Sequence, residues 1–475
     1  MPPEPPESAT ANSEPTLDLA RVQHVHIVGI GGAGMSAIAI VLARMGFTVS
    51  GSDLKESRAL ERLGAAGIDA VVGHRAEHLA ADVDAVVVST AIPATNAEVV
   101  AAHARGIPVH RRADALRAIV ATRRGIAVAG SHGKTTTSSM LALVLRAAGW
   151  RPTFIIGGDV NEVGTNAAYD DGAWMVVEAD ESDGTFLELP AEAAIVTNIE
   201  PDHLDHYGSF DALVRAFDDF VAAVPGPRVA SADDPLAAAL AARAGLTTFG
   251  FADIADYRIV EWSGGRDGSR LVVHQRGSEL GTLTLPVPGR HNALNAVAAA
   301  ALATELGVAF ADTARALAGF GGVARRFEFR GERDGVTLVD DYAHLPTEVR
   351  AMVGAARDGG WNRVVAVFQP HRYTRTARLW QDFADAFVDA DVVVLTDVYA
   401  AGETPQPGVS GRLVLQAILD AHPDTAAVYL PRRHDVVAHT LRFARPGDIV
   451  LTLGAGDLTT VPDEWLLAPA PSGTR

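Results

Sequence analysis

The chain has 475 residues, of which 48% are hydrophobic, and a length of this order favours about three domains rather than one core. It has no cysteine and a formal net charge of −18, which excludes disulfides and thiolate metal sites, fits a reducing cytoplasm and argues against a broad nucleic-acid surface. Its apolar runs last only a few residues, against roughly 18 for a membrane-spanning helix, so we expect no membrane insertion.

The chain opens with a segment rich in proline and glutamate, which we expect to be a disordered tail over residues 1–19. The next unit, residues 20–121, begins with an apolar strand at Val25–Val28, a glycine turn, a helix at Met35–Met45 and a second strand at Thr48–Ser50. This order is typical of a βαβ unit. Later apolar runs repeat the pattern, which predicts a small parallel sheet of the Rossmann type with helices on both faces.

The glycine turn Gly29–Gly34 has the spacing G-x-G-x-x-G, lies between a strand and a helix, and is followed by an acid, Asp53, after the second strand. Glycines let a pyrophosphate approach the backbone, the helix N-terminus offers free N–H donors, and an acid can bind a ribose hydroxyl. The turn alone leaves three interpretations open: a purely structural turn, a site for NAD or FAD, or a site for another nucleoside diphosphate compound.

Residues 122–322 form the expected central domain, in which the buried strand Gly125–Ala129 leads into the loop Gly130–Thr135 and a helix over Thr136–Ala148. The loop has two residues between its first glycine and the Gly-Lys pair, whereas the common P-loop pattern has four. In such a loop backbone N–H groups, Lys134 and a hydroxyl surround phosphates and Mg²⁺, so we expect it to bind ATP.

The basic residues of the chain are almost all arginines. Of the 40 lysines and arginines only Lys55 and Lys134 are lysines, and the second lies in this loop. A slim ammonium group can reach into a crowded triphosphate where the planar guanidinium of arginine fits poorly. The retained lysine therefore supports a phosphate-binding role for the loop.

Two acidic segments follow two later strands of the central domain. Glu178–Asp183 comes after Met175–Val177, and Asn198–His206 comes after Ala194–Val196. Because the carboxyl ends of parallel strands meet at one sheet edge, we expect these acids and histidines to gather there, where carboxylates suit Mg²⁺. Residues 228–288 alternate short strands with turns, which predicts an added small β region.

The C-terminal unit, residues 323–475, again alternates strands with helices, which predicts a second Rossmann-like, doubly wound sheet. Two of its strands end in polar runs, Asp340–His344 and Gln369–Arg375. Arg372 and Arg375 in the second run could hold a carboxylate by paired hydrogen bonds. We therefore expect an α/β protein of three domains, in which a central P-loop ATPase-like domain lies between two Rossmann-like domains in the sequence.

Together these motifs resemble those of the Mur ligases of peptidoglycan synthesis, and the resemblance covers nearly the whole chain after the tail. The segments that carry it follow one another along the chain: Gly29–Ser36, Gly130–Thr136, Glu178–Asp183, Asn198–Asp205, Gly289–Asn292, Arg325–Glu328, Asp341–His344 and His371–Arg375. The resemblance implies that the three domains bind UDP-N-acetylmuramate, ATP and an amino acid, in that order. It also implies an amide-bond ligase, in which ATP converts the muramoyl carboxylate to an acyl phosphate that the amine of L-alanine then opens.

The resemblance assigns residues to each ligand. The UDP-sugar is assigned to the first glycine loop and the acid beyond it: Gly29, Gly31, Gly32, Ala33, Gly34, Met35, Ser36 and Asp53. ATP is assigned to the second loop and to later residues: Gly130, Ser131, His132, Gly133, Lys134, Thr135, Thr136, His291, Asn292, Asn295, Arg326 and Asp341. The amino acid is assigned to Tyr342, His344, His371, Arg372 and Arg375, and Mg²⁺ or Mn²⁺ to Thr135, Glu178 and His203. The residues assigned to catalysis are Lys134, His203, Arg326 and His344.

Within the family, the chain is most similar to the member that adds L-alanine. Sibling ligases commonly hold one metal through a carbamylated lysine beyond the phosphate loop, and this chain has no lysine after Lys134. One departure is Leu345, which stands where the family usually shows the second of two histidines before Pro346. The departure bears on the geometry around His344 rather than on the activity. We expect a monomer or a weak homodimer.

Three other functions fit parts of the sequence. A nicotinamide dehydrogenase explains the first glycine loop only, and a non-catalytic ATP-binding regulator explains the second loop only. A recycling relative that adds a preformed tripeptide is the nearest rival enzyme, although its first loop usually reads differently from Gly31–Ser36.

Overall fold

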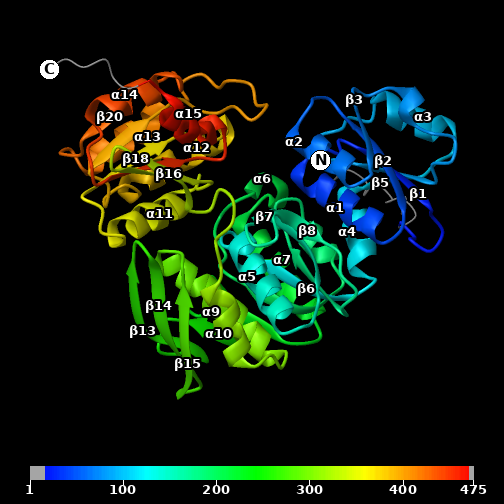
Figure 1. Ribbon diagram of the computed structural model, residues 1–475, viewed down its shortest axis with the longest axis horizontal. Helices are drawn as coiled ribbons and strands as arrows, with labels where there is room; N and C mark the ends of the chain where they lie inside the picture. Colours follow the sequence, from blue (N-terminus) through cyan, green and yellow to red (C-terminus); the bar gives the residue numbers. More distant parts are fainter. Residues whose placement is uncertain (1–16, 470–475) are drawn as a thin grey trace, which may run out of the picture. The chain divides into compact units, whose positions relative to one another are not determined.

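Short buried runs of valine, alanine and isoleucine form the central strands of three β-sheets in the computed structural model, which describes residues 17–469 (Figure 1). By its internal contacts the chain divides into two compact units. Within the described residues the first unit comprises 17–127, 151–157 and 166–193, and the second comprises 128–150, 158–165 and 194–469.

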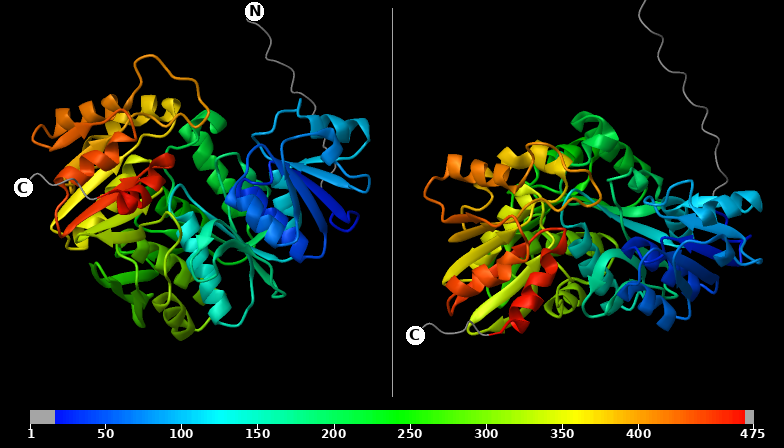
Figure 2. Two further views of the ribbon diagram at one scale, coloured as in Figure 1. Left: turned by 45° about the horizontal axis from the view of Figure 1, so that its top comes forward. Right: turned by 90° about the horizontal axis from the view of Figure 1, so that it is seen from above.

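A five-stranded parallel sheet belongs to the first unit and has the strand order β3-β2-β1-β4-β5. Its strands are β1 (His24–Val28), β2 (Thr48–Asp53), β3 (Asp69–Val72), β4 (Ala85–Val88) and β5 (Val109–Arg111). Its helices are α1 (Ala33–Arg44), α2 (Arg58–Ala65), η1 (Ala76–His78), α3 (Ala97–Ala104) and α4 (Arg112–Val120). Figure 2 shows blue helices of this part of the chain beside its strands. The strand order reverses between β1 and β4, so the loop after β1 lies at the switch point where such sheets bind ligands.

A ten-stranded sheet has the order β15-β14-β13-β12-β11-β10-β6-β9-β7-β8. Its strands are β6 (Arg124–Ala129), β7 (Thr153–Val160), β8 (Thr165–Ala168), β9 (Trp174–Glu178), β10 (Ala191–Val196), β11 (Arg228–Ser231), β12 (Thr247–Gly250), β13 (Tyr257–Gly265), β14 (Gly268–Gln275) and β15 (Ser278–Leu285). The helices in this stretch of chain are α5 (Lys134–Ala147), η2 (Thr185–Glu188), α6 (Leu204–Tyr207), α7 (Phe210–Ala223), α8 (Pro235–Ala244), α9 (Arg290–Glu305) and α10 (Phe310–Ala318). The antiparallel strands β13, β14 and β15 extend the sheet and form the small added β region.

A six-stranded sheet in the second unit has the order β16-β17-β21-β18-β19-β20, in which β16 alone runs antiparallel to its neighbour. Its strands are β16 (Glu328–Arg333), β17 (Val336–Asp341), β18 (Arg363–Phe368), β19 (Val392–Leu395), β20 (Ala427–Tyr429) and β21 (Asp448–Leu453). Its helices are α11 (Pro346–Asp358), α12 (Tyr373–Leu379), η3 (Trp380–Asp385), α13 (Gly411–Ala421), α14 (Asp435–Phe443), η4 (Asp457–Thr460) and α15 (Val461–Leu467).

Strand β18 shows why helices cover both faces of this sheet. Val364, Ala366 and Phe368 pack into one apolar cluster with α11 and α13, whereas Val365 and Val367 pack into a second cluster with α14 and α15. Successive side chains of a strand point to opposite faces, so a continuous apolar run needs a cover on each side. The doubly wound arrangement expected from the sequence follows from this pattern.

The predicted fold class, an α/β protein of three domains, is confirmed, whereas the predicted domain bounds stay a prediction. Helices α1 and α5 each begin two residues earlier than expected, at Ala33 and Lys134, and Asp53 is the last residue of β2 rather than a residue beyond it. Of the predicted tail, residues 1–16 lie outside the described residues, and Leu17 is buried. Among residues 17–469, no helix combines the length and the apolar character that crossing a bilayer requires.

Candidate active site

The loop Gly130–Thr135 joins the buried strand β6 to helix α5, and two of its glycines have backbone conformations that other residues disfavour. Gly130 has a φ of +128°, and a Cβ atom there would collide with the Thr197 hydroxyl. Gly133 precedes α5 with a φ of +79°, and a Cβ atom there would meet the Asn295 amide. Both positions therefore require glycine, and the loop can bring its backbone N–H groups close to an anion.

Lys134 begins α5, and its side chain folds back over the loop. The Nζ atom donates a hydrogen bond to the Gly130 carbonyl oxygen at 2.6 Å and lies 3.4 Å from the carbonyl oxygen of Ser131. The ammonium group is thus held at the mouth of the loop, where the N–H groups of the helix N-terminus already favour negative charge. The loop provides the charge that a phosphate site needs.

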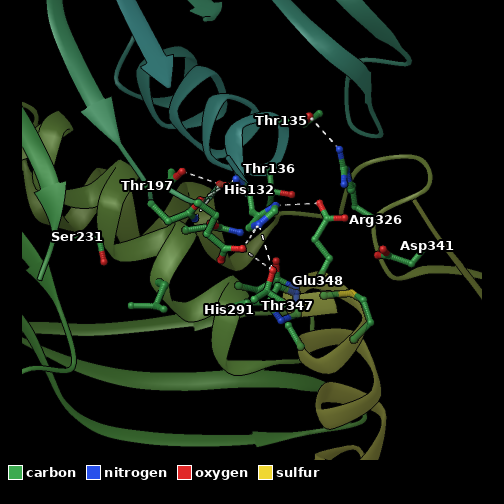
Figure 3. Close-up of a pocket in the computed structure, with 18 of the residues that line it drawn as sticks. His132, Thr135, Thr136, Thr197, Ser231, His291, Arg326, Asp341, Thr347 and Glu348 are labelled. Atoms are coloured by element: carbon green, nitrogen blue, oxygen red, sulfur yellow. Dashed lines mark hydrogen bonds and ion pairs between the residues drawn. The ribbon is translucent and has the colours of Figure 1, made fainter. Parts of the chain in front are cut away.

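A cavity of about 220 Å³ lies beside this loop (Figure 3). Its walls include nine of the residues predicted to bind ATP: His132, Gly133, Thr135, Thr136, His291, Asn292, Asn295, Arg326 and Asp341. Three more residues with this prediction, Gly130, Ser131 and Lys134, belong to the loop but not to the cavity wall. The structure therefore gathers the ATP set from segments more than 200 residues apart around one loop and one cavity.

The other wall residues were not predicted from the sequence: Thr197, Asn198, Glu200, Ser231, Phe249, Leu294, Thr347, Glu348, Ala351 and Met352. Asn198 and Glu200 lie in an acidic segment that the sequence marks after a strand, so a signal for them existed. Phe249 and Met352 are ordinary apolar residues of a strand and a helix, and no motif distinguishes them from the core.

Burial and one arginine shift the pKa values of two groups in the cavity wall, His291 and Asp341. Burial and the nearby Arg326 charge lower the pKa of His291 to about 4, so this imidazole is neutral at pH 7. Burial raises the pKa of Asp341 to about 7, although Arg326 and the N–H groups of Phe327 and Ala343, each 2.7 Å from its carboxylate, oppose the rise. Arg326 is thus the cation that faces both groups.

The residues predicted to bind an amino acid gather at the carboxyl ends of β17 and β18. Arg375 Nη1 lies 3.1 Å from His371 Nδ1, and the ring of His371 stacks on Tyr399 with centroids 5.7 Å apart. The ring of His344 meets His371 edge-on at 5.9 Å and Tyr342 at 5.3 Å. The guanidinium of Arg375 is therefore held against His371, whose ring is itself held by its contacts with Tyr399 and His344.

Arg372, the fifth residue of this set, has a φ of +69° at the start of α12, in the left-handed region that non-glycine residues rarely adopt. Its N–H donates to the Tyr399 carbonyl oxygen at 2.9 Å, which holds the turn. Burial, His344 and Arg375 lower the pKa of His371 to about 4, so His371 is neutral beside the arginines. The positive charge of the cluster thus resides on arginine.

Asp202 and His203 meet this cluster from the acidic segment that follows β10. Asp202 Oδ2 lies 3.7 Å from Arg375 Nη2 and 3.2 Å from His203 Nε2. His203 has a φ of +54° at the start of α6. The segment Asn198–His206 therefore contributes Asn198 and Glu200 to the cavity wall and Asp202 to the arginine cluster.

The residues predicted to hold a metal are Thr135, Glu178 and His203. Arg326 Nη2 lies 3.5 Å from Thr135 Oγ1, and Glu178 Oε2 accepts the Gly157 N–H at 2.7 Å. Within residues 17–469 no three carboxylate or imidazole side chains form a group that could hold a metal ion alone. The Thr135 hydroxyl and the Glu178 carboxylate are the kind of oxygen donor that a hard divalent cation prefers.

The first glycine loop, in the other compact unit, is held by hydrogen bonds to β2. The N–H groups of Gly29 and Ile30 donate to the Ser52 carbonyl oxygen at 2.8 and 3.0 Å, and that of Gly31 donates to Asp53 Oδ2 at 2.9 Å. A Cβ atom at Gly31 would lie 2.8 Å from Asp53 Oδ2. The loop therefore has the tight form that pyrophosphate binding requires.

The remaining residues predicted for the UDP-sugar lie in or next to this loop. Gly32 precedes α1, and Ala33 and Gly34 open it. The side chains of Met35 and Ser36 are buried, with 2% and 6% of each residue exposed. These two residues support the helix start from the core side.

Three sequence models of one enzyme family together match most of the chain. The Mur ligase family catalytic domain matches residues 24–124, the Mur ligase middle domain matches residues 128–303, and the Mur ligase glutamate ligase domain matches residues 325–456.

Relatives of nearly equal length are similar to this chain throughout. The UDP-N-acetylmuramate–L-alanine ligase of Pelotomaculum thermopropionicum is 48% identical over 92% of this chain and 95% of its own, and that of Rubrobacter xylanophilus is 47% identical over 93% and 99%. The structure of the UDP-N-acetylmuramate-alanine ligase of Thermotoga maritima aligns with a TM-score of 0.80 at 31% identity, over 94% of this chain and 98% of its own. A murein peptide ligase of Psychrobacter arcticus aligns with a TM-score of 0.67 at 26% identity, over the same shares of the two chains.

Proposed function

The chain belongs to the Mur ligase family, and we propose that it joins L-alanine to the carboxylate of UDP-N-acetylmuramate, with conversion of ATP to ADP and phosphate, in peptidoglycan precursor synthesis. The observation that carries the proposal is that one compact unit holds both a lysine-bearing phosphate loop with its cavity and an arginine cluster suited to a carboxylate. Relatives that share about 48% of their residues with this chain bear the name of this activity.

The first step phosphorylates the sugar. An oxygen of the muramoyl carboxylate attacks the γ-phosphorus of ATP, the bond to the βγ-bridging oxygen breaks, and ADP leaves. Negative charge crowds at the transferred group, so the Lys134 ammonium and the N–H groups of the loop stabilise the transition state. Arg326, which faces the cavity beside Thr135, adds a second positive charge on the nucleotide side.

The second step forms the amide. The amine of L-alanine attacks the carbonyl carbon of the acyl phosphate, the amine gives up a proton, and inorganic phosphate leaves. Arg375 is the group that holds the alanine carboxylate, with Arg372 beside it, because His371 and Tyr399 keep its guanidinium in place. His344 lies in the same cluster and orients it through its contact with His371.

Mg²⁺ belongs to the proposal as well, with Thr135, Glu178 and His203 as its protein ligands. Their hydroxyl, carboxylate and imidazole donors suit a divalent cation that completes its shell with phosphate oxygens and water. When bound, such an ion neutralises charge on the phosphate being transferred. Glu178 is positioned for this by the Gly157 N–H, which fixes one of its carboxylate oxygens.

The domain bounds are also part of the proposal. We assign UDP-sugar binding to residues 20–121, ATP binding to 122–322 and amino-acid binding to 323–475. The second and third matched spans of the family fall inside these ranges, and the first, 24–124, extends three residues beyond its range. The expected cytoplasmic location and monomeric or weakly dimeric state stay predictions from the sequence.

Phosphate release from ATP tests the proposal. The full-length protein is supplied with UDP-N-acetylmuramate and, in turn, L-alanine, glycine, L-serine or the peptidoglycan tripeptide, and the product mass is determined. We expect release that needs both the sugar and L-alanine, with a product heavier by one alanyl residue. Release with the tripeptide alone would establish the recycling activity instead. Nucleotide binding without any amino-acid-dependent release would indicate a regulator, and tight NAD binding without ATP turnover would indicate a dehydrogenase.

A further inference from the structure

The imidazole of His132 lies between two carboxylates that come from different parts of the chain, and Figure 3 labels one of them, Glu348. Its Nδ1 atom is 3.1 Å from Glu348 Oε1, and its Nε2 atom is 3.0 Å from Glu200 Oε2. Glu348 is in α11, beside the six-stranded sheet, and Glu200 is in the segment after β10. A single residue of the phosphate loop thus joins two other segments of the cavity wall.

The charges favour this bridge. Burial alone would lower the pKa of His132, but the Glu348 and Glu200 carboxylates raise it to about 10, so the imidazole is a cation at neutral pH. Although burial raises the pKa of Glu348, His344 and His132 hold it well below its ordinary value. The Arg326 charge lowers it further, and the carboxyl groups of Asp341 and Glu200 also face Glu348. Both ring nitrogens therefore donate to ionised oxygens, which are the strong kind of hydrogen bond.

Thr347 adds a second contact between the start of α11 and the cavity wall around His132 and Glu200. Thr347 Oγ1 donates to Glu200 Oε2 at 2.8 Å and lies 3.2 Å from His132 Nε2. Because Thr347 precedes Glu348 on the first turn of α11, the start of this helix is fixed to the phosphate loop at two adjacent residues. The beginning of α11 is therefore positioned by side-chain bonds as well as by packing.

Glu348 carries the connection onward to the amino-acid cluster. Its Oε2 atom accepts the N–H of His344 at 2.8 Å and the N–H of Leu345 at 3.1 Å. One carboxylate thus bonds the phosphate loop with one oxygen and the backbone of His344 with the other. Leu345, the residue that departs from the family pattern, is 5% exposed and takes part through its backbone.

We propose that the His132–Glu348 bridge, supported by Glu200 and Thr347, is a positioning device that holds His344 and the start of α11 in register with the phosphate loop for the amide-forming step. The inference rests on the proposed function and adds positioning residues to it. The bridge links the place where the acyl phosphate forms to the cluster that receives the amine. Its loss weakens the second step more than the first.

The test compares the two steps in Glu348→Gln, His132→Gln and the double variant of the full-length protein. Glutamine at 348 keeps an acceptor for the His344 N–H but removes the charge that faces His132. The first step is measured by positional isotope exchange in ATP labelled at the βγ bridge, with UDP-N-acetylmuramate and no alanine. The second is measured as kcat/KM for L-alanine. Arg350→Gln is the matched control, because Arg350 lies on the same helix in an exposed pair with Asp385.

In Glu348→Gln we expect kcat/KM for L-alanine to fall roughly 10-fold to 100-fold, and to fall at least about 10-fold further than the exchange rate. The double variant should lose little more than Glu348→Gln alone, because both changes break one bridge. Arg350→Gln should match the wild type. Thr347→Ala, a change at an exposed residue, should lower kcat/KM for L-alanine by a smaller factor, again more than the exchange rate. This variant replaces Glu348→Gln in the test if Glu348→Gln does not fold.

Equal losses in exchange and in alanine kcat/KM would place Glu348 in nucleotide binding and overturn the inference. Fully additive losses in the double variant would show that His132 and Glu348 act independently, and this result would also overturn the inference. A wild-type protein without alanine-dependent phosphate release would overturn the proposed function itself, and the inference with it, so the two failures are distinct.

Discussion

The two glycine-rich loops use the same backbone device but place charge differently. Each follows a buried parallel strand and opens a helix. Each also contains glycines at which an added Cβ atom would lie too close to a neighbouring residue. Below the first loop, the Asp53 carboxylate accepts the Gly31 N–H. In the second loop, the Lys134 ammonium folds over the loop carbonyls. The first loop therefore combines its N–H donors with an acid, and the second combines them with a cation.

This difference fits the two different ligands that we propose for two loops of the same strand–loop–helix type. An acid beside a glycine loop suits a sugar hydroxyl next to a diphosphate, whereas a lysine suits the greater charge of a triphosphate. The supports differ too. Ser52, whose carbonyl holds the first loop, donates its hydroxyl to the buried carboxylate Glu98, whereas neutral groups, Thr197 and Asn198, hold the second loop at the His132 backbone.

Lys134→Arg should have the largest effect, because it changes the cation that distinguishes the second loop from the first. The bulkier, planar guanidinium does not fit where Nζ now donates to Gly130, so we expect kcat to fall by about 1,000-fold or more. Binding of UDP-N-acetylmuramate, measured by calorimetry, and the thermal unfolding midpoint should barely change. Near-normal turnover in the folded variant would contradict the role given to the lysine.

Gly130→Ala and Gly31→Ala form a matched pair that should separate the two ligands. In the second loop, the new methyl group collides with Thr197, so the kcat with ATP should fall roughly 10-fold to 100-fold while the Kd for UDP-N-acetylmuramate stays near the wild-type value. In the first loop, the methyl group meets Asp53 and Leu60, so the Kd for the sugar nucleotide should rise by a similar factor and the KM for ATP should not. If Gly130→Ala weakened binding of the sugar nucleotide and Gly31→Ala impaired the use of ATP, the two ligands would have to be assigned to the opposite loops.

Asp53→Ala should have a smaller effect confined to the sugar nucleotide. It removes the charged acceptor of the Gly31 N–H and the acid offered to a ribose hydroxyl, so we expect KM for UDP-N-acetylmuramate to rise about 10-fold. Asp53→Asn keeps an acceptor at this place and should lose less. An increase in KM for ATP instead would show that the first loop belongs to the other nucleotide.

Glu98→Gln tests the support of the first loop and should change stability rather than turnover. Burial raises the pKa of Glu98, but His26, 3.5 Å away, the Ser52 hydroxyl and the Arg75 N–H lower it to about 2, against an ordinary value of 4.5. A lowered pKa stabilises the fold above pH 4.5, and this contribution is lost as the pH falls toward 2. We therefore expect the difference in Tm between wild type and variant to be largest at pH 5–7 and to narrow by pH 3. A constant difference down to pH 3 would contradict the ionised state.

Much of the fold could be predicted because its strands are continuous apolar runs. The buried valines of β18 and β19 can only be central strands with helices on both faces, and polar runs after β17 and β18 must then share one sheet edge. Helix α5 starts earlier than predicted because Gly133 adopts a positive φ, which lets the helix begin directly at Lys134. Such a turn depends on backbone conformation that residue spacing alone leaves open.

The cavity wall was predicted only where residues belong to motifs. Ser231, Phe249 and Met352 come from separate segments and have the identities of ordinary strand and helix residues, so only the folded chain brings them together. The same holds for the bridge from His132 to Glu348, whose partners are more than 200 residues apart in sequence. Pairings of this range depend on packing, which a single sequence does not contain.

The central claim is that the muramoyl carboxylate is activated by phosphorylation in a reaction completed by L-alanine. It is tested most directly with UDP-N-acetylmuramate labelled with ¹⁸O in the lactyl carboxylate, together with ATP, Mg²⁺ and L-alanine. The released phosphate is analysed by mass spectrometry. If an acyl phosphate forms and the amine opens it at carbon, each phosphate carries one ¹⁸O from the carboxylate, and the sugar product carries one alanyl residue. Unlabelled phosphate released at the same rate would contradict the account, because ATP would then be hydrolysed without activation of the carboxylate.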